Sequence, residues 1–186
     1  AALGSGVIGP GVLCMVAGTW SINEVVTPAP IVDKRLYQCS LFAVPGMWLT
    51  IEASATSATN LEWFVTNFCY EEQQEAHARG ISVYDVCNEK VASLGAAGAA
   101  SDIIFHPYLF GSDVQPTARA GFYGLGAWHT KAHLLRALYE GVVYGHMHHI
   151  AKLRAAGATM DCARLTGGGS HSHVRTQTVA DALQPP

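Results

Sequence analysis

The sequence has no apolar run long enough to cross a bilayer. Its longest apolar stretches, GVLCMVAG and SLFAVPGMWLTI, are much shorter than the roughly 20 residues that a membrane-spanning helix needs. The chain does not open with a basic segment followed by an apolar one, so no secretory signal is visible. We therefore expect a soluble protein in the cytoplasm, without a membrane partner.

Charge is scarce in this sequence, and its basic residues are scattered. Asp, Glu, Lys and Arg make up 13% of the 186 residues, and 11 basic against 14 acidic side chains give a net charge of −3. Nucleic-acid phosphates are neutralised by clustered Lys and Arg, and the sequence contains no such run. We therefore exclude nucleic acid as a partner. A hydrophobic fraction of 49% at this length predicts one domain with a substantial core.

Metal-binding and disulfide patterns are also missing. The five cysteines are widely spaced, lack any CxxC pair and mostly have apolar neighbours, which predicts buried thiols. They are Cys14, Cys39, Cys69, Cys87 and Cys162. His146 and His149 of the segment HMHHI share one helix face, but the sequence offers no third ligand. We therefore predict a packing or solvated role for these histidines and no metal site.

Apolar alternation and turn residues predict strands in three parts of the chain. The predicted strands cover residues 12–18, 21–26, 37–54 (two strands, broken at Pro45 and Gly46), 102–110 and 161–166. The first four strands indicate an antiparallel meander. The low-complexity segment GAAGAA predicts a flexible connection before the strand at 102–110.

Helical periodicity predicts four helices, over residues 56–80, 82–94, 130–156 and 172–183. In the first, Leu61, Phe64, Val65 and Phe68 share an apolar face, and Gly80 is placed to end the helix. We expect Glu71, Glu72 and Glu75 to form a solvated face of it. Strands followed by helices, then a strand and a helix again, predict a three-layer α/β domain with a mixed sheet flanked by helices.

Two turn segments carry groups that suit an anion or a polar ligand. In AGTWSIN, backbone N–H groups and the hydroxyls of Thr19 and Ser21 can point outward toward a phosphate, although an ordinary hairpin turn uses the same residues. In LTGGGSHS, three glycines indicate a positive φ angle, a close ligand approach or a tolerant loop. Ser170 is the predicted N-cap of the helix that follows. This loop lacks the Gly-Lys-Ser/Thr ending of a Walker A motif.

Taken together, these segments resemble the C-terminal domain of the FGGY carbohydrate kinases. The resemblance rests on ALGSGVIGPGVLCMVAGTWS, FHPYLFGSDVQPTARAGFYGL, LLRALYEGVVYGH and RLTGGGSHSHVRTQTVADAL. It covers nearly the whole chain, and GTWSINE is similar to the L-xylulose kinase-like branch. It implies a ribonuclease-H-like, actin-like ATPase fold. Residues 1–186 would be the nucleotide-binding C-terminal domain of a larger chain, and the N-terminal sugar-binding domain would be absent.

The resemblance also implies nucleotide contacts at eight positions, which are Gly18, Thr19, Ser21, Gly167, Gly168, Gly169, Ser170 and His171. Gly18 and Thr19 would meet the terminal phosphates of ATP, which also carry Mg²⁺, and Ser21 is a weaker candidate. The glycine triplet would lie against adenosine, which would leave no room for Cβ atoms. Ser170 and His171 would flank the base. His171 stands where the family often has a Lys or Arg.

The implied activity is the transfer of the γ-phosphate of ATP to a hydroxyl of a ketose or polyol, with L-xylulose as the branch-level substrate. The catalytic aspartate would lie upstream of Ala1, so no residue of this chain is assigned as catalytic, and the chain alone would be inactive. The alternative is a non-catalytic oligomerisation or interaction domain. Apolar surface that a companion domain would cover predicts a homodimer.

Overall fold

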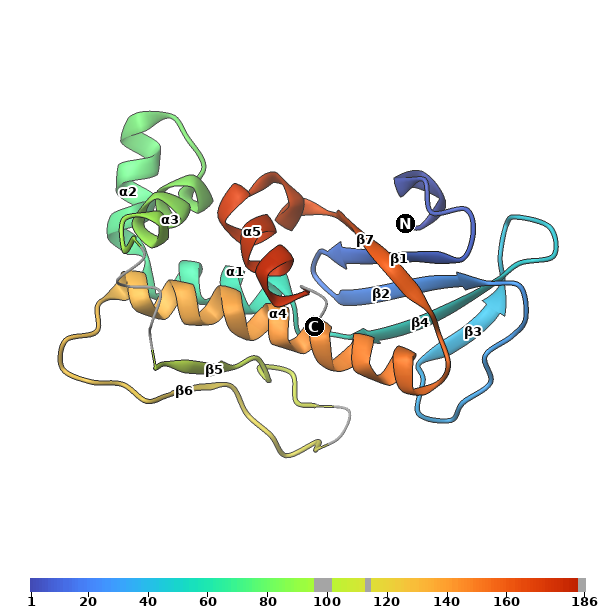
Figure 1. Ribbon diagram of the computed structural model, residues 1–186. Helices are drawn as coiled ribbons and strands as arrows, with labels where there is room; N and C mark the ends of the chain where they lie inside the picture. The colour runs from blue at the N-terminus through green and yellow to red at the C-terminus, as the bar shows by residue number, and fades with distance from the viewer. Residues whose placement is uncertain (96–101, 113–114, 184–186) are drawn as a thin grey trace.

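The main sheet has five strands in the order β3-β4-β2-β1-β7 (Figure 1). The computed structural model describes residues 1–95, 102–112 and 115–183. The strands of this sheet are β1 (Gly11–Ala17), β2 (Ser21–Thr27), β3 (Gln38–Leu41), β4 (Trp48–Ser54) and β7 (Met160–Thr166). β7 pairs with β1 in parallel, whereas the other neighbours are antiparallel. The predicted mixed sheet is therefore confirmed, but the predicted meander was wrong, because β2 pairs with β4 and β3 lies at the edge.

The helices described in the structure are α1 (Ala58–Phe68), α2 (Tyr70–Arg79), α3 (Val83–Ala92), α4 (Lys131–Ala155) and α5 (His173–Ala182), with short 3₁₀ turns η1 (Leu3–Ser5) and η3 (Gly168–His171). α4 runs along the sheet (Figure 1). Because side chains alternate along a strand, Leu13 and Met15 of β1 share a face. They pack in one cluster with Ile150 and Leu153 of α4, which Val179 of α5 joins.

The opposite face of the sheet has a different cover. Cys14 of β1 and Val26 of β2 pack there against Ala2 and Val7 of the N-terminal segment, and Phe42 joins them from the loop after β3. In the described part of the chain, helices therefore pack on one face of the sheet only. The predicted α/β domain with a mixed sheet flanked by helices is confirmed, and the residues that cover the second face form a 3₁₀ turn and loops.

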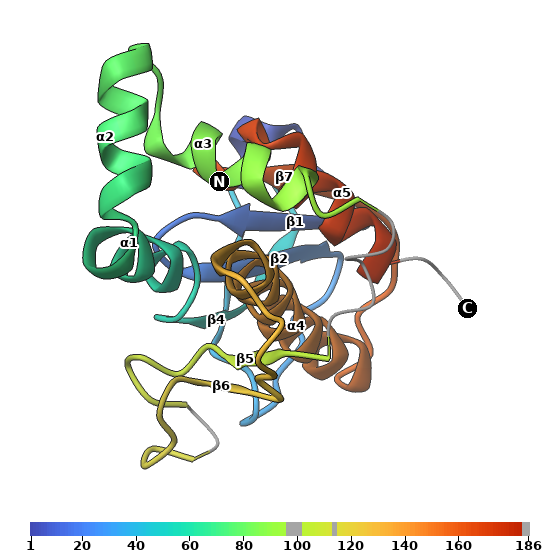
Figure 2. The ribbon, with the colours of Figure 1, turned by 90° about the vertical axis from the view of Figure 1, so that its left-hand side faces the viewer.

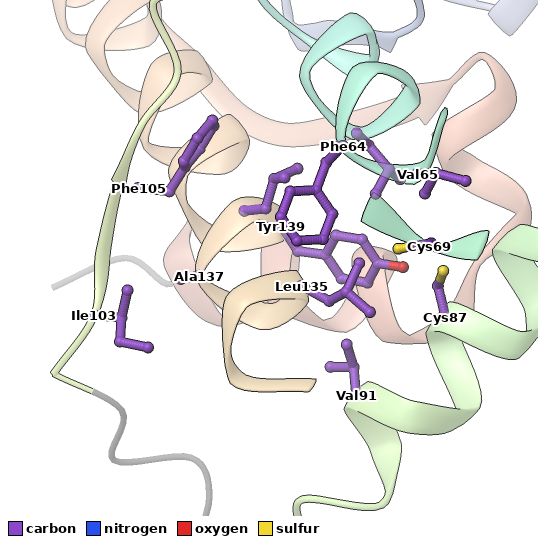
Figure 3. Packing of buried hydrophobic residues seen from close by; sticks show 12 residues of the cluster. Phe64, Val65, Cys69, Cys87, Val91, Ile103, Phe105, Leu135, Ala137 and Tyr139 are labelled. Atoms are coloured by element: carbon purple, nitrogen blue, oxygen red, sulfur yellow. The ribbon is translucent and has the colours of Figure 1, made fainter. Parts of the chain in front are cut away.

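The predicted helix over residues 56–80 is divided in two at Cys69. The backbone of Cys69 leaves the helical region, with φ −113° and ψ 46°, so that α1 ends and α2 begins there. The Cys69 side chain is fully buried, and Figure 3 shows its sulfur facing that of Cys87 on α3. Leu61 and Phe64 are buried as predicted, but Phe68 is 52% exposed and does not belong to the core. The sequence holds no Gly or Pro at this break, so packing against α3 decides it.

Glu72 of α2 is not solvated as the sequence predicts. Its side chain is 1% exposed and lies 2.9 Å from Lys131 Nζ and 3.3 Å from Lys90 Nζ. Burial alone would raise the pKa of this carboxyl group, but hydrogen bonds from Lys131 and Lys90 hold the pKa below its usual value. Glu71 and Glu75 are exposed, as expected. Glu72 thus ties α2 to α3 and to the start of α4.

The strand predicted over 102–110 is shorter in the structure, and the strand that pairs with it was not predicted from the sequence. β5 (Ile104–His106) pairs antiparallel with β6 (Gly121–Tyr123), and this two-stranded sheet lies along α4, separate from the main sheet (Figure 2). Pro107 follows β5 directly, and its missing N–H cannot join a strand ladder. Most of the segment GAAGAA falls outside the described residues. The helices α3, α4 and α5 begin and end within about two residues of their predicted limits.

Candidate functional site

The turn between β1 and β2 places Thr19 at the carboxyl end of β1. The strands pair up to Ala17 and Ser21, which leaves three residues, 18–20, in the turn. The Gly18 carbonyl accepts a 3.0 Å hydrogen bond from the backbone N–H of Ala58, so the start of α1 is fixed to this turn. Thr19 is exposed. Its hydroxyl and the neighbouring backbone donors are therefore accessible to a ligand.

Ser21 does not point outward with Thr19, and this part of the prediction was wrong. Its side chain is 1% exposed, and its hydroxyl is buried without a hydrogen-bond partner among the described residues. Ser21 lies two residues before Asn23, and both project from the face of β2 that α4 covers. Strand alternation therefore turns Ser21 into the interior.

The three glycines of the loop after β7 differ in backbone conformation and in the space around them. Gly167 has φ 91°, and a Cβ there would lie 2.9 Å from the carbonyl oxygen of Ala17. A Cβ on Gly169 would lie 2.6 Å from the Cβ of Ala17. Packing of this loop against the end of β1 thus explains why Gly167 and Gly169 lack a side chain. The resemblance had implied that contact with adenosine was the reason. Only Gly168 has open space, with no atom within 4 Å of its Cβ position.

Ser170 is not the N-cap of the last helix. Ser172 takes that role, since its hydroxyl accepts a 3.3 Å hydrogen bond from the backbone N–H of Arg175. Ser170 lies within η3 and donates its hydroxyl to the Gly167 carbonyl at 2.7 Å. The 3₁₀ turn delays the start of α5 by two residues, which the repeated serines of SHS do not reveal. His171 is exposed at the end of η3.

The two loops meet in one cleft with a volume of about 330 Å³. The paired ends of β1 and β7, which lie side by side in Figure 1, bring them together. The cleft is lined by Ala17, Gly18, Thr19, Ala58, Leu61, Glu62, Tyr84, Gly168, Gly169 and Arg175. Four of the eight predicted positions are among them. The other four, Ser21, Gly167, Ser170 and His171, do not line it.

The helical part of the cleft was not predicted from the sequence. Ala58, Leu61 and Glu62 of α1 have the spacing of one helix face, which is a signal that could have been used. Arg175 lies in the first turn of α5, where the helix dipole disfavours a positive charge, so its placement was also a signal. Nothing in the local sequence marks Tyr84 of α3.

Polar groups gather at the end of the cleft that lies away from Thr19. Glu62 is one helical turn beyond Ala58, a rise of about 6 Å along α1. Burial raises the pKa of the Tyr84 hydroxyl, the nearby charge of Glu62 raises it further, and Arg175 opposes them. These three side chains are therefore close enough to influence one another. The Cζ atom of Arg175 lies 5.6 Å from the centroid of the Tyr139 ring.

Beneath the turn, two histidines of α4 bind the sheet. His146 Nδ1 lies 3.0 Å from Asn23 Oδ1, and burial lowers the pKa of His146 to about 3, so the ring is neutral at pH 7. His149 Nε2 lies 2.9 Å from Ser54 Oγ. Burial favours the neutral form of Glu52, but the ion pair with Lys152 and the nearby His149 ring hold its pKa below the usual value. The predicted packing role of both histidines is confirmed.

The described residues form neither a metal site nor a membrane-spanning helix. Within the ranges 1–95, 102–112 and 115–183, no group of three or more His, Cys, Asp or Glu side chains could hold a metal ion. Over the same ranges, none of the helices has the length and apolar character needed to cross a membrane.

A mixed sheet that brings the Gly18–Thr19 turn and the glycine loop to one cleft agrees with the fold that the sequence resemblance implied. The sequence profile of the FGGY family of carbohydrate kinases, C-terminal domain, matches residues 13–186, and the chain belongs to this family.

Individual relatives agree with this assignment. The chain is 38% identical over 167 residues to the L-xylulose/3-keto-L-gulonate kinase of Escherichia coli (strain K12), which covers 89% of this chain and 31% of that protein. It is 27% identical to the gluconokinase of Bacillus subtilis (strain 168), over 98% of this chain and 36% of that one. The crystal structure of a xylulose kinase from Rhodospirillum rubrum superposes with a TM-score of 0.84 and 29% identity, covering 98% and 35%. The chain thus spans about a third of these relatives.

Proposed function

We propose that this chain is the nucleotide-binding part of an ATP-dependent kinase that phosphorylates a hydroxyl of a ketose or polyol, with L-xylulose as the sugar. The observation that carries the proposal is the meeting of the Gly18–Thr19 turn and the Gly168 position in one cleft. The 38% identity to a kinase of L-xylulose supports this choice of sugar. The sugar-binding site and the catalytic base would lie in the part of the polypeptide that precedes this chain.

The two ends of the cleft suit the two ends of a nucleotide. Thr19 is exposed and its hydroxyl can donate a hydrogen bond, which suits the terminal phosphates and the charge that develops on them. Mg²⁺ would be held through the phosphate oxygens. Gly168 leaves space for the nucleoside on the opposite wall. The cleft volume of about 330 Å³ falls at the small end of ligand pockets, as expected for a partly open site.

Gly168→Val should raise the KM for ATP several-fold and leave kcat nearly unchanged. No protein atom lies within 4 Å of the position that a Cβ would take there, so the branched side chain would extend into open space beside the nucleoside. The measurement is steady-state kinetics on the full-length polypeptide, with ATP and the sugar each varied. Gly121→Val is the matched control, because Gly121 also has no atom within 4 Å of its Cβ position and lies on β6, outside the cleft.

Direct binding tests the same assignment. ADP should change the fluorescence of Trp20, which adjoins Thr19 and is 44% exposed, and Gly168→Val should shift the titration to higher ADP concentration. A full-length wild-type protein that stays folded and binds no ADP would contradict the nucleotide assignment. That result would favour the non-catalytic interaction domain.

The second part of the proposal is a homodimer. Ile104 of β5 and Tyr123 of β6 are opposite each other in the hairpin, and both side chains are exposed. Leu125 and Trp128 extend this apolar surface beyond β6. Exposed apolar patches usually mark an interaction surface. Sedimentation velocity on the full-length protein should show a dimer that Tyr123→Lys weakens, and a wild-type monomer at high concentration would refute the dimer.

A further inference from the structure

Arg175 is the basic residue of the cleft, and its charge is not neutralised within the described residues. None of the carboxylates in the described ranges pairs with its guanidinium group, and its Nε atom is buried without a hydrogen-bond partner there. A cation that is partly withdrawn from water and lacks an acidic partner is costly. Its position beside a cleft therefore calls for a ligand that compensates the cost.

A rigid aromatic ring supports the guanidinium group from one side. The Cζ atom of Arg175 lies over the Tyr139 ring, 5.6 Å from its centroid. Tyr139 is buried in the core that Figure 3 shows, and its hydroxyl donates a 2.9 Å hydrogen bond to Asn88 Oδ1. Ser172, the cap of α5, donates to the same oxygen at 3.0 Å. The stacked pair is thus fixed to both α3 and α5.

Arg175 also lines the cleft, together with Gly168, which has no side chain, and with Ala58 and Leu61 of α1, which are apolar. Small and apolar walls beside a guanidinium group suit a flat ring. Arginine stacks on aromatic rings through its planar face, which the ammonium group of a lysine cannot do.

We propose that Arg175 determines the affinity for the nucleoside by stacking the purine base on the guanidinium face that lies opposite Tyr139. The inference rests on the proposed function, since it takes the ligand to be a purine nucleotide with its phosphates at Thr19. Arg175 and Glu62 lie at the other end of the cleft, where the base of such a nucleotide falls. Arg175 is then a specificity-determining residue with no part in the transfer of the phosphoryl group.

The test compares Arg175→Lys and Arg175→Met in the full-length protein. Lysine keeps the charge and loses the planar face, and methionine loses both. Each variant should raise the KM for ATP and the dissociation constant of ADP about tenfold, the size of the loss of one stacking partner of a base. Neither should change kcat. Inorganic pyrophosphate, which has no base, should bind both variants as it binds wild type. Arg154→Met is the matched control, because Arg154 is exposed near the end of α4, outside the cleft.

Several results would overturn the inference. If Arg175→Lys binds ADP like wild type, charge and not the planar face acts on the ligand. If the variants lose thermal stability while their ADP affinity is unchanged, Arg175 serves only to pack on Tyr139. A wild-type protein that binds neither ADP nor pyrophosphate would instead refute the proposed function itself, and this inference with it. Normal ADP binding by wild type with unaffected Arg175 variants would refute the inference alone.

Discussion

Thr19→Ala should lower the kcat of the full-length protein about 100-fold, with little change in the KM for ATP. The exposed hydroxyl of Thr19 lies in the turn that faces the cleft. Phosphoryl transfer depends mainly on positioning and on donors that stabilise developing charge. The loss of a single such donor typically costs about 10²–10³ in kcat. Steady-state kinetics at saturating sugar, with ATP varied, would measure this effect.

The controls for Thr19 come from the same hairpin. Thr19→Ser keeps the hydroxyl and should retain most of the activity. Thr27→Ala removes a hydroxyl at the far end of β2, where it donates to the Ala29 carbonyl, and should leave kcat unchanged. If Thr19→Ala remained folded with wild-type kcat, the turn would not contact the transferred group. Gly168→Val would then be the remaining test of the cleft.

The double variant Lys90→Met, Lys131→Met should lower the free energy of unfolding by about 3–5 kcal/mol at pH 7, the usual cost of leaving a buried charge unpaired. Both lysines contact the Glu72 carboxylate, which is 1% exposed. Urea unfolding followed by circular dichroism would measure the loss. Adding Glu72→Leu should recover most of it, because the unpaired charge is then removed. Lys34→Met, at an exposed site, should have little effect.

The same variant should respond to pH in the opposite direction from wild type. In wild type the pKa of Glu72 is lowered from 4.5, so the carboxylate contributes stability above that pH and loses it as the pH falls through the folded-state pKa. Without the lysines, burial raises the pKa, and protonation on acidification relieves the unpaired charge. The stability gap between the two proteins should therefore narrow from pH 7 to pH 4. An equal gap at both values would contradict the role assigned to Glu72.

Local sequence patterns predicted the helices and strands in which buried apolar residues recur at regular spacing. The long helix α4 and the strands β1, β2 and β4 follow from apolar spacing, because each presents a continuous face to the core. The break at Cys69 could not be predicted in this way, since it depends on how α2 and α3 pack and not on a helix-breaking residue. The burial of Glu72 was missed for a similar reason. Its partners, Lys90 and Lys131, reach it from other helices.

The cleft shows the same division. The Gly18–Thr19 turn and the Gly168 position were singled out by their turn residues after a strand, and their nucleotide role was implied by the resemblance to the FGGY kinases. Ser21 was misplaced because the direction of a side chain at a strand end depends on register. Tyr84 and Arg175 come from α3 and α5, and only the tertiary arrangement brings them to the end of the cleft. Local sequence therefore predicts the loops of the site better than its helical walls.

The pairing of β1 with β7 sets the order in which this site can be completed. Leu13 of β1 pairs with Ala163 of β7, so the contact closes nearly the whole length of the sequence. Such non-local contacts form slowly, because closing the long loop between them costs conformational entropy before the strand pairing contributes any stabilising free energy. During synthesis, the edge of β1 that pairs with β7 keeps unpaired N–H and C=O groups until β7 has left the ribosome. The cleft therefore appears at the end of folding, and the unpaired edge of β1 is the part of the nascent chain most exposed to aggregation.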